Sequence, residues 1–176
     1  MGYTAGVDEW SGVRTALLIV VWATVAGGAL MAVLWIAFGG ERAIGPEDEM
    51  MARAGVRIKH EGRRLTSFSS AQVGIHGFLG LMTASLITYA AVRSDDRGGG
   101  YAACLVAIAV TAIPGTLMFL KWRGGRRPAM AGARAAASSA AAPPRVEDRL
   151  PRPVVLLHGA AAVTTFGLLV ALLLLD

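Results

Sequence analysis

Long apolar stretches alternate with shorter polar ones along the whole chain. Four apolar stretches reach the length of a membrane span, namely residues 15–38, 71–92, 101–120 and 153–175. A hydrocarbon core of about 30 Å requires about 20 apolar residues at a rise of 1.5 Å each. Backbone polar groups must be satisfied within the protein when they lie in lipid, so each stretch is expected to be an α-helix. The pattern therefore predicts an all-α integral membrane protein, a four-helix bundle.

The polar stretches predict the parts of the chain outside the spans. Residues 1–14 form a short N-terminal segment, and residues 93–100 form a short turn between the second and third spans. In the connection 39–70, a proline and three acidic residues precede Met50 and Met51, which predicts a short helix lying at the membrane interface. Residues 121–152 are rich in alanine, serine and proline, which predicts a flexible linker.

Basic residues outside the spans predict the orientation in the membrane. The first connection carries Arg42, Arg53, Arg57, Lys59, Arg63 and Arg64. The third connection carries Lys121, Arg123, Arg126, Arg127, Arg134, Arg145, Arg149 and Arg152. Short connections rich in lysine and arginine remain in the cytoplasm. We therefore expect a multi-pass protein of the bacterial inner (cell) membrane, with both long connections in the cytoplasm and both termini extracytoplasmic.

Composition narrows the function classes. The 176 residues are 55% hydrophobic and only 16% charged, unlike a water-soluble enzyme. The net charge of +5 fits the predicted orientation better than binding to nucleic acid, which needs a soluble basic surface. The single cysteine, Cys104, excludes cysteine-based zinc sites and covalently attached c-type haem. The expected partner is therefore the lipid bilayer, and no nucleic acid is expected.

Two of the three histidines lie inside predicted spans, in similar surroundings. The segment VGIHGFLGLMTASL around His76 aligns with VLLHGAAAVTTFGL around His158, and each histidine is the sixth residue of its span. Both therefore lie about 8–9 Å into their helices. The match suggests two tandem helical hairpins, a parallel repeat related by an axis along the membrane normal. His60, the third histidine, lies in the charged first connection.

Helical spacing places two further residues on the same helix face as each histidine. Positions i, i+4 and i+7 share one face of a helix. His76 is followed on its face by Gly80 and Thr83. His158 is followed in the same way by Ala162 and Thr165. A polar stripe is unfavourable towards lipid, so both stripes are expected to face the bundle interior.

This arrangement is suited to a haem. In an up-down-up-down bundle the second and fourth helices are diagonal neighbours, so two imidazoles could hold a metal between them. A b-type haem requires two neutral imidazoles from separate helices and an apolar wall. His76 and His158 are therefore the candidate metal ligands, and Gly80, Thr83, Ala162 and Thr165 the candidate pocket lining. With no further intramembrane histidine, the chain could hold one such haem b.

In its span count and its two His-Gly sites, the chain resembles small membrane cytochromes b, which hold haem between histidines of a four-helix bundle. The resemblance implies electron transfer, with quinone or other membrane subunits as partners. It carries over His76 and His158 alone, as axial ligands.

Two other function classes compete with this interpretation. The alternative is a non-catalytic accessory or scaffold subunit of a larger, respiratory-type membrane complex, with the histidines in packing contacts. A small transporter or channel is less favoured, because no acidic residue lies within a predicted span. The sequence does not indicate a catalytic triad or another set of catalytic residues.

Overall fold

The computed structural model describes residues 5–43, 45–55, 65–93, 99–125 and 145–175. Four long helices dominate these residues: α1 (Ala5–Ala37), α3 (Ser70–Val92), α4 (Gly99–Gly125) and α5 (Arg152–Leu175). A short helix, α2 (Pro46–Arg53), and two 3₁₀ turns, η1 (Gly40–Arg42) and η2 (Val146–Arg149), lie in the connections. The all-α fold class predicted from the sequence is confirmed.

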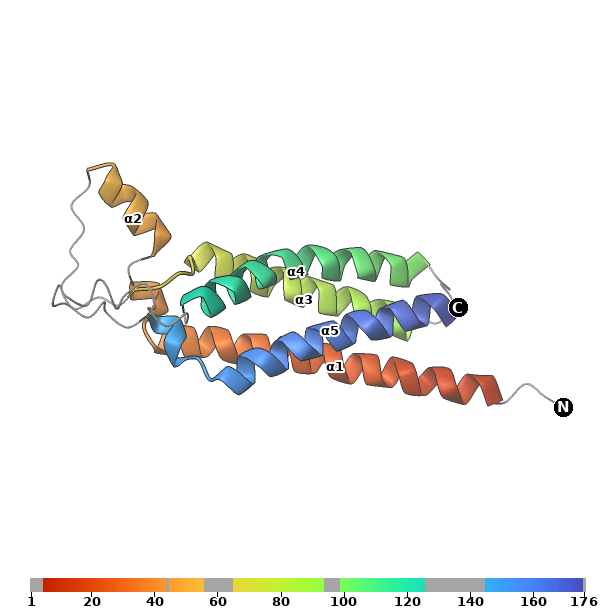
Figure 1. The fold of residues 1–176 in the computed structure, drawn as a ribbon. Helices are drawn as coiled ribbons and strands as arrows, with labels where there is room; N and C mark the ends of the chain where they lie inside the picture. Colours follow the sequence, from red (N-terminus) through yellow and green to blue (C-terminus); the bar gives the residue numbers. More distant parts are fainter. Residues whose placement is uncertain (1–4, 44, 56–64, 94–98, 126–144, 176) are drawn as a thin grey trace.

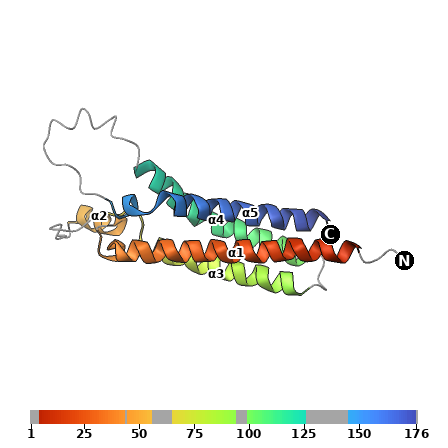
Figure 2. The same cartoon turned by 90° about the horizontal axis from the view of Figure 1, so that it is seen from below.

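The four long helices form an up-down-up-down bundle. Helix α1 packs against α5 and α3, and α4 packs against α3 and α5, so that α3 and α5 are diagonal to each other. Figures 1 and 2 show that α1 begins and α5 ends at the same end of the bundle, here called the terminal end. At the opposite end, here called the loop end, α1 and α4 finish and α3 and α5 begin.

All four long helices are long and apolar enough to cross a membrane, with candidate spans Ser11–Ala37, Ser70–Val92, Gly100–Gly124 and Arg152–Leu174. Large apolar side chains are exposed on the outside of every one of them, including Val33, Phe78, Ile113 and Val163. Water would disfavour such a surface, whereas lipid tails suit it. The predicted multi-pass membrane class is therefore confirmed.

The helices extend beyond the apolar stretches at two places. Helix α1 begins at Ala5, within the predicted N-terminal segment, and α4 continues to Gly125 beyond the predicted span end at Leu120. Apolar stretches mark the part of a helix that lies in lipid, whereas the backbone hydrogen bonds can continue past it.

The first connection contains a helix where the sequence predicts one. Helix α2 projects away from the bundle axis at the loop end (Figure 1), and its Met50 and Met51 side chains are exposed. His60 and Ile58 of the same connection lie outside the described residues, as do residues 94–98 of the predicted turn.

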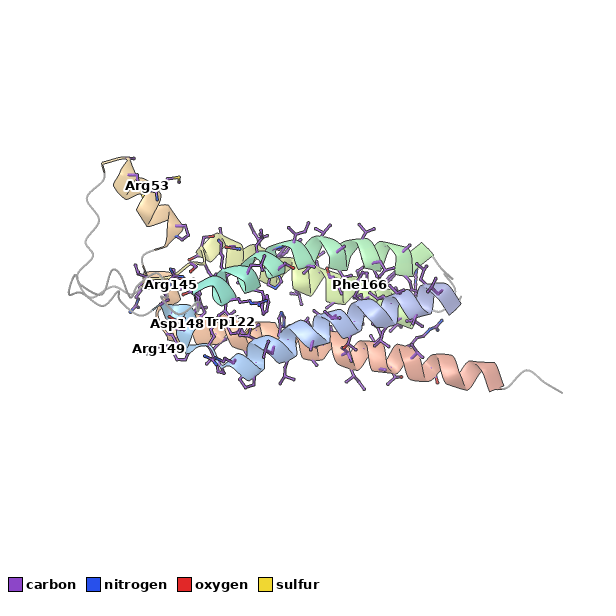
Figure 3. All side chains as sticks on the ribbon, in the orientation of Figure 1. Arg53, Trp122, Arg145, Asp148, Arg149 and Phe166 are labelled. Carbon is purple, nitrogen blue, oxygen red and sulfur yellow. The ribbon has the colours of Figure 1, made fainter. Side chains whose placement is uncertain are left out.

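Part of the predicted flexible linker is packed against the loop end. Residues 145–150 lie beside residues 65–69, with Val146 N donating to the Leu65 carbonyl at 2.9 Å. Figure 3 shows Arg145, Asp148 and Arg149 gathered at this end, near Trp122. The expectation of a flexible segment across 121–152 therefore does not hold for residues 145–150, because Val146 and Leu150 are buried in an apolar cluster. Residues 126–144 lie outside the described part of the chain.

A buried carboxylate secures this contact. Glu147 is only 2% exposed, and its Oε1 accepts a hydrogen bond from Thr66 Oγ1 at 2.9 Å and another from the backbone N–H of Ser67. Trp35 of α1 donates from Nε1 to the same Thr66 hydroxyl at 3.3 Å. The network joins α1, the start of α3 and η2, and so it closes the loop end of the bundle.

Candidate functional site

The bundle has two apolar clusters of buried residues, and a layer without fully buried residues lies between them. Near the terminal end, one cluster contains Leu17, Val21, Ala84, Ile87, Tyr101, Cys104, Leu169 and Leu172. Near the loop end, the other contains Trp35, Ala43, Phe68, Trp122, Val146 and Leu150. Between them, residues 24–34, 70–82, 105–121 and 152–164 include no buried residue. This middle layer extends for at least about 15 Å along the bundle, and its partly buried apolar side chains, such as Val25, Ile108 and Phe119, pack against the two clusters.

Both intramembrane histidines lie in the middle layer and face each other across the bundle. His76 comes from α3 and His158 from the diagonal helix α5. Their ring centroids are 6.2 Å apart, and the ring planes are nearly perpendicular at 85°. The inward orientation of both stripes, predicted from helical spacing, therefore brings the two imidazoles together.

The distance between the two ring centroids limits how the imidazoles can interact. A nitrogen lies about 1.1 Å from the centre of an imidazole ring, and a direct N–H···N hydrogen bond is about 2.9 Å long, so directly bonded rings have centroids within about 5.1 Å. The observed 6.2 Å is too long for such a bond. Two metal–nitrogen bonds of about 2.0–2.1 Å arranged in line would place the centroids about 6.2–6.4 Å apart. The centroid distance therefore matches both one metal atom in line between two imidazoles and a direct edge-to-face ring contact, in which centroids lie about 4.5–7 Å apart.

The ring of His158 is held by α1. Its Nδ1 lies 2.9 Å from the backbone carbonyl oxygen of Thr24. Because a carbonyl can only accept, Nδ1 carries the proton in the neutral imidazole, and Nε2 of that tautomer has the lone pair. A Cβ added to Gly28 would lie 3.1 Å from His158 Cε1, so the ring lies directly over the α1 backbone. The lone pair on Nε2 is the feature required of a metal ligand.

The ring of His76 is held by α4 in a corresponding way. A Cβ added to Gly115 would lie 2.7 Å from His76 Cε1, so glycine is required for the ring to approach the α4 backbone. The buried Nδ1 of His76 makes no hydrogen bond within the described part of the chain. The arrangement around His76 thus resembles that around His158 without the hydrogen bond.

The other predicted site residues occupy the middle layer or its border. Gly80 and Ala162 are half-buried, and a Cβ added to Gly80 would meet nothing within 4 Å. Thr83 is buried, and its hydroxyl pairs with that of Thr111 on α4 at 2.8 Å. Thr165 is buried and donates to the carbonyl of Ala161 in its own helix at 2.9 Å. Gly80 therefore has room for a larger side chain, whereas the hydroxyls of Thr83 and Thr165 already have partners.

The donor set restricts the kind of metal group that fits. Among the described residues, no group of three or more His, Cys, Asp or Glu side chains could hold a metal ion. Two imidazoles alone do not complete a tetrahedral zinc site. A haem brings four equatorial nitrogens of its own and needs only axial ligands from the protein. The donor chemistry of this pair therefore suits a group that brings its own equatorial ligands better than a bare ion.

Sequence reasoning missed the two residue pairs that hold the rings. Thr24 and Gly28 belong to TVAGG, and Thr111 and Gly115 belong to TAIPG, so that both helices carry threonine and glycine four residues apart. This repeat is visible in the sequence, but nothing local connects it to histidines on other helices.

Comparison with models of protein families, with curated proteins and with solved structures finds no match to this chain.

Proposed function

We propose that this protein is a small membrane b-type cytochrome, in which His76 and His158 are the axial ligands of one haem b and the chain takes part in electron transfer. The observation that carries the proposal is the pair of imidazoles from diagonal helices, whose ring centroids lie 6.2 Å apart between the two apolar clusters. Bound haem would supply the one-electron chemistry. The protein residues supply neutral imidazoles, hold their planes, and surround the site with apolar helices.

Two protein ligands favour electron transfer over reactions at the metal. When both axial positions are filled by histidine, no coordination position is left open for a substrate. The electron partners in this proposal are quinone or another membrane subunit, because both can approach the site within the bilayer. The apolar outer faces of the helices support lipid contact alone.

The proposal includes the tandem repeat of two hairpins, α1 with α3 and α4 with α5. Under this repeat α1 corresponds to α4, and α3 corresponds to α5. The packing of His158 against Gly28 of α1 then corresponds to that of His76 against Gly115 of α4. The matched packing pairs, α1 with α5 and α4 with α3, support the same relation.

We further propose that the loop end faces the cytoplasm and that both termini are extracytoplasmic. In a cysteine-free background made with Cys104→Ala, a cysteine at Ser139 is expected to react with a membrane-impermeant maleimide only after the membrane is opened. A cysteine at Ser11 is expected to react in intact cells, because it lies near the start of α1 at the opposite end. Labelling of the Ser139 position in intact cells would contradict the orientation.

The proposed cofactor is tested most directly by an optical spectrum. Protein purified in detergent from cells supplied with haem is expected to show a Soret band and, after reduction, sharp α and β bands of a low-spin haem. Pyridine extraction is expected to give at most one haem b per chain, because the chain has only one pair of intramembrane histidines. A folded, colourless preparation would favour the alternative, a scaffold subunit whose histidines make packing contacts.

A further inference from the structure

The backbones behind the two histidines are alike on two helices that lie far apart in the sequence. On α1, the Thr24 carbonyl accepts from His158 Nδ1, and Gly28 lies one turn further along beneath the same ring. On α4, Gly115 lies beneath the His76 ring, one turn beyond Thr111, and His76 Nδ1 has no hydrogen-bond partner among the described residues. Each imidazole thus meets a bare glycine one turn beyond a threonine on a neighbouring helix, and His158 is also hydrogen-bonded to the carbonyl of that threonine.

We infer that these two Thr-x-x-x-Gly segments are paired positioning elements, which fix the ring planes of His76 and His158 perpendicular to each other. The inference rests on the proposed function, because it assigns what orients the ligands of the proposed haem. Neither Gly28 nor Gly115 touches the metal in this assignment. Both act through the histidine that lies over them.

The contacts explain why the rings cannot turn freely. Each ring approaches its glycine most closely with Cε1, and for His158 the hydrogen bond from Nδ1 to the Thr24 carbonyl also fixes the rotation about the Cβ–Cγ bond. Such outer contacts commonly set the tautomer and orientation of metal-bound histidines. Because α1 and α4 are diagonal in the bundle, the two rings are held from opposite sides. We attribute the observed angle of 85° between their planes to these separate supports.

The two supports differ in how much room they leave. A Cβ on Gly115 would come within 2.7 Å of His76 Cε1, whereas one on Gly28 would remain 3.1 Å from His158 Cε1. A Cβ on Gly27 would meet His158 only at an ordinary 3.6 Å, and one on Gly159 would meet nothing within 4 Å. Gly115→Ala is therefore expected to displace the His76 ring most, and Gly28→Ala to displace the His158 ring less. Gly27→Ala and Gly159→Ala are expected to displace neither ring.

Electron paramagnetic resonance of the oxidised protein tests this assignment, because the orientation of the axial imidazole planes sets the ligand field of low-spin ferric iron. Perpendicular planes give a signal with one large principal g value, and more nearly parallel planes give a rhombic signal. We expect the large-g signal in the wild-type protein and in Gly27→Ala and Gly159→Ala. Gly115→Ala and Gly28→Ala are expected to move it towards the rhombic form, Gly115→Ala further.

A coupling experiment keeps the inference testable if an alanine variant folds poorly. His76→Gly supplied with free imidazole replaces the tethered ring by one that can choose its own plane. If Gly115 acts through the His76 ring, Gly115→Ala is expected to change the spectrum of this imidazole-loaded protein less than that of the His76 protein, because the free ring can shift away from the added methyl group. An equal spectral change in both backgrounds would show that Gly115 acts elsewhere in the fold.

The outcomes separate the inference from the proposed function. Wild-type protein without haem would overturn the proposed function, and the inference with it. A haem protein that loses its bands in His76→Ala and His158→Ala, but shows identical resonance signals in all four alanine variants, would overturn the positioning role alone.

Discussion

Replacing either His76 or His158 by alanine is expected to abolish the sharp α and β bands of the reduced protein. Each histidine supplies one of the two axial nitrogens in the proposed site, and a low-spin spectrum requires both. The double replacement is expected to remove the Soret band as well, because no described His, Cys, Asp or Glu side chain joins these two to form a larger metal-binding group. Absorption spectra of the purified variants, normalised to protein concentration, measure the effect.

The third histidine and a rescue experiment provide the controls. His60→Ala is expected to keep the complete spectrum, because this residue lies in the charged connection outside the spans. His76→Gly is expected to regain the bands when free imidazole is added, since the missing ring leaves a space of its own size. A histidine that merely packs helices together would show no such spectral rescue. Unchanged spectra in both alanine variants would mean that any bound haem has other ligands.

The fold was predictable because its main determinant is local. A run of about 20 apolar residues has to be a helix in lipid, and four such runs joined by short connections pack as an antiparallel bundle. The positions of His76 and His158 were predictable for the same reason. Helical spacing within one span is enough to place a histidine on the inward face, at a depth that the span boundaries set.

The supports of the histidines were not predictable in this way. His158 and its acceptor Thr24 are 134 residues apart, and the pairing depends on which helices become neighbours and at what relative height. The threonines of the predicted pocket show a related difference. Thr83 and Thr165 are buried as an inward stripe requires, but their hydroxyls bond to α4 and to Ala161. A threonine in a helix can satisfy itself on a backbone carbonyl without facing a ligand.

The packing of residues 145–150, in the third connection, also could not be predicted from composition. Around VEDRL the chain is rich in alanine, proline and arginine, which is typical of an unstructured linker. Glu147 is nevertheless buried, because its partners Thr66 and Ser67 lie about 80 positions earlier and offer two donors to one oxygen. A charged residue can be buried when such donors lie close to it in space, and the local sequence does not show which donors these are.

Replacing Glu147 by alanine is therefore expected to lower the free energy of unfolding by about 2–4 kcal/mol, since hydrogen bonds to a charged group contribute about 1.5–3 kcal/mol each and the abandoned donors stay buried. The Thr66 hydroxyl would keep its contact with Trp35, but the N–H of Ser67 would lose the acceptor seen here. Thermal unfolding in detergent, followed by circular dichroism, measures the loss. Faster tryptic cleavage after Arg145 and Arg149 is expected to accompany it, because both are exposed beside the released turn.

Two variants separate the hydrogen bonds from the charge. Glu147→Gln keeps an oxygen acceptor for Thr66 and Ser67, so it is expected to retain most of the stability. Asp148→Ala changes the adjacent exposed carboxylate and is expected to have little effect. Glu147 Oε2 has no hydrogen-bond partner among the described residues, so the buried charge itself also has a desolvation cost. Equal unfolding temperatures for Glu147→Ala and Asp148→Ala would mean that the desolvation cost of Glu147 cancels the gain from its hydrogen bonds. The network would then not stabilise the loop end.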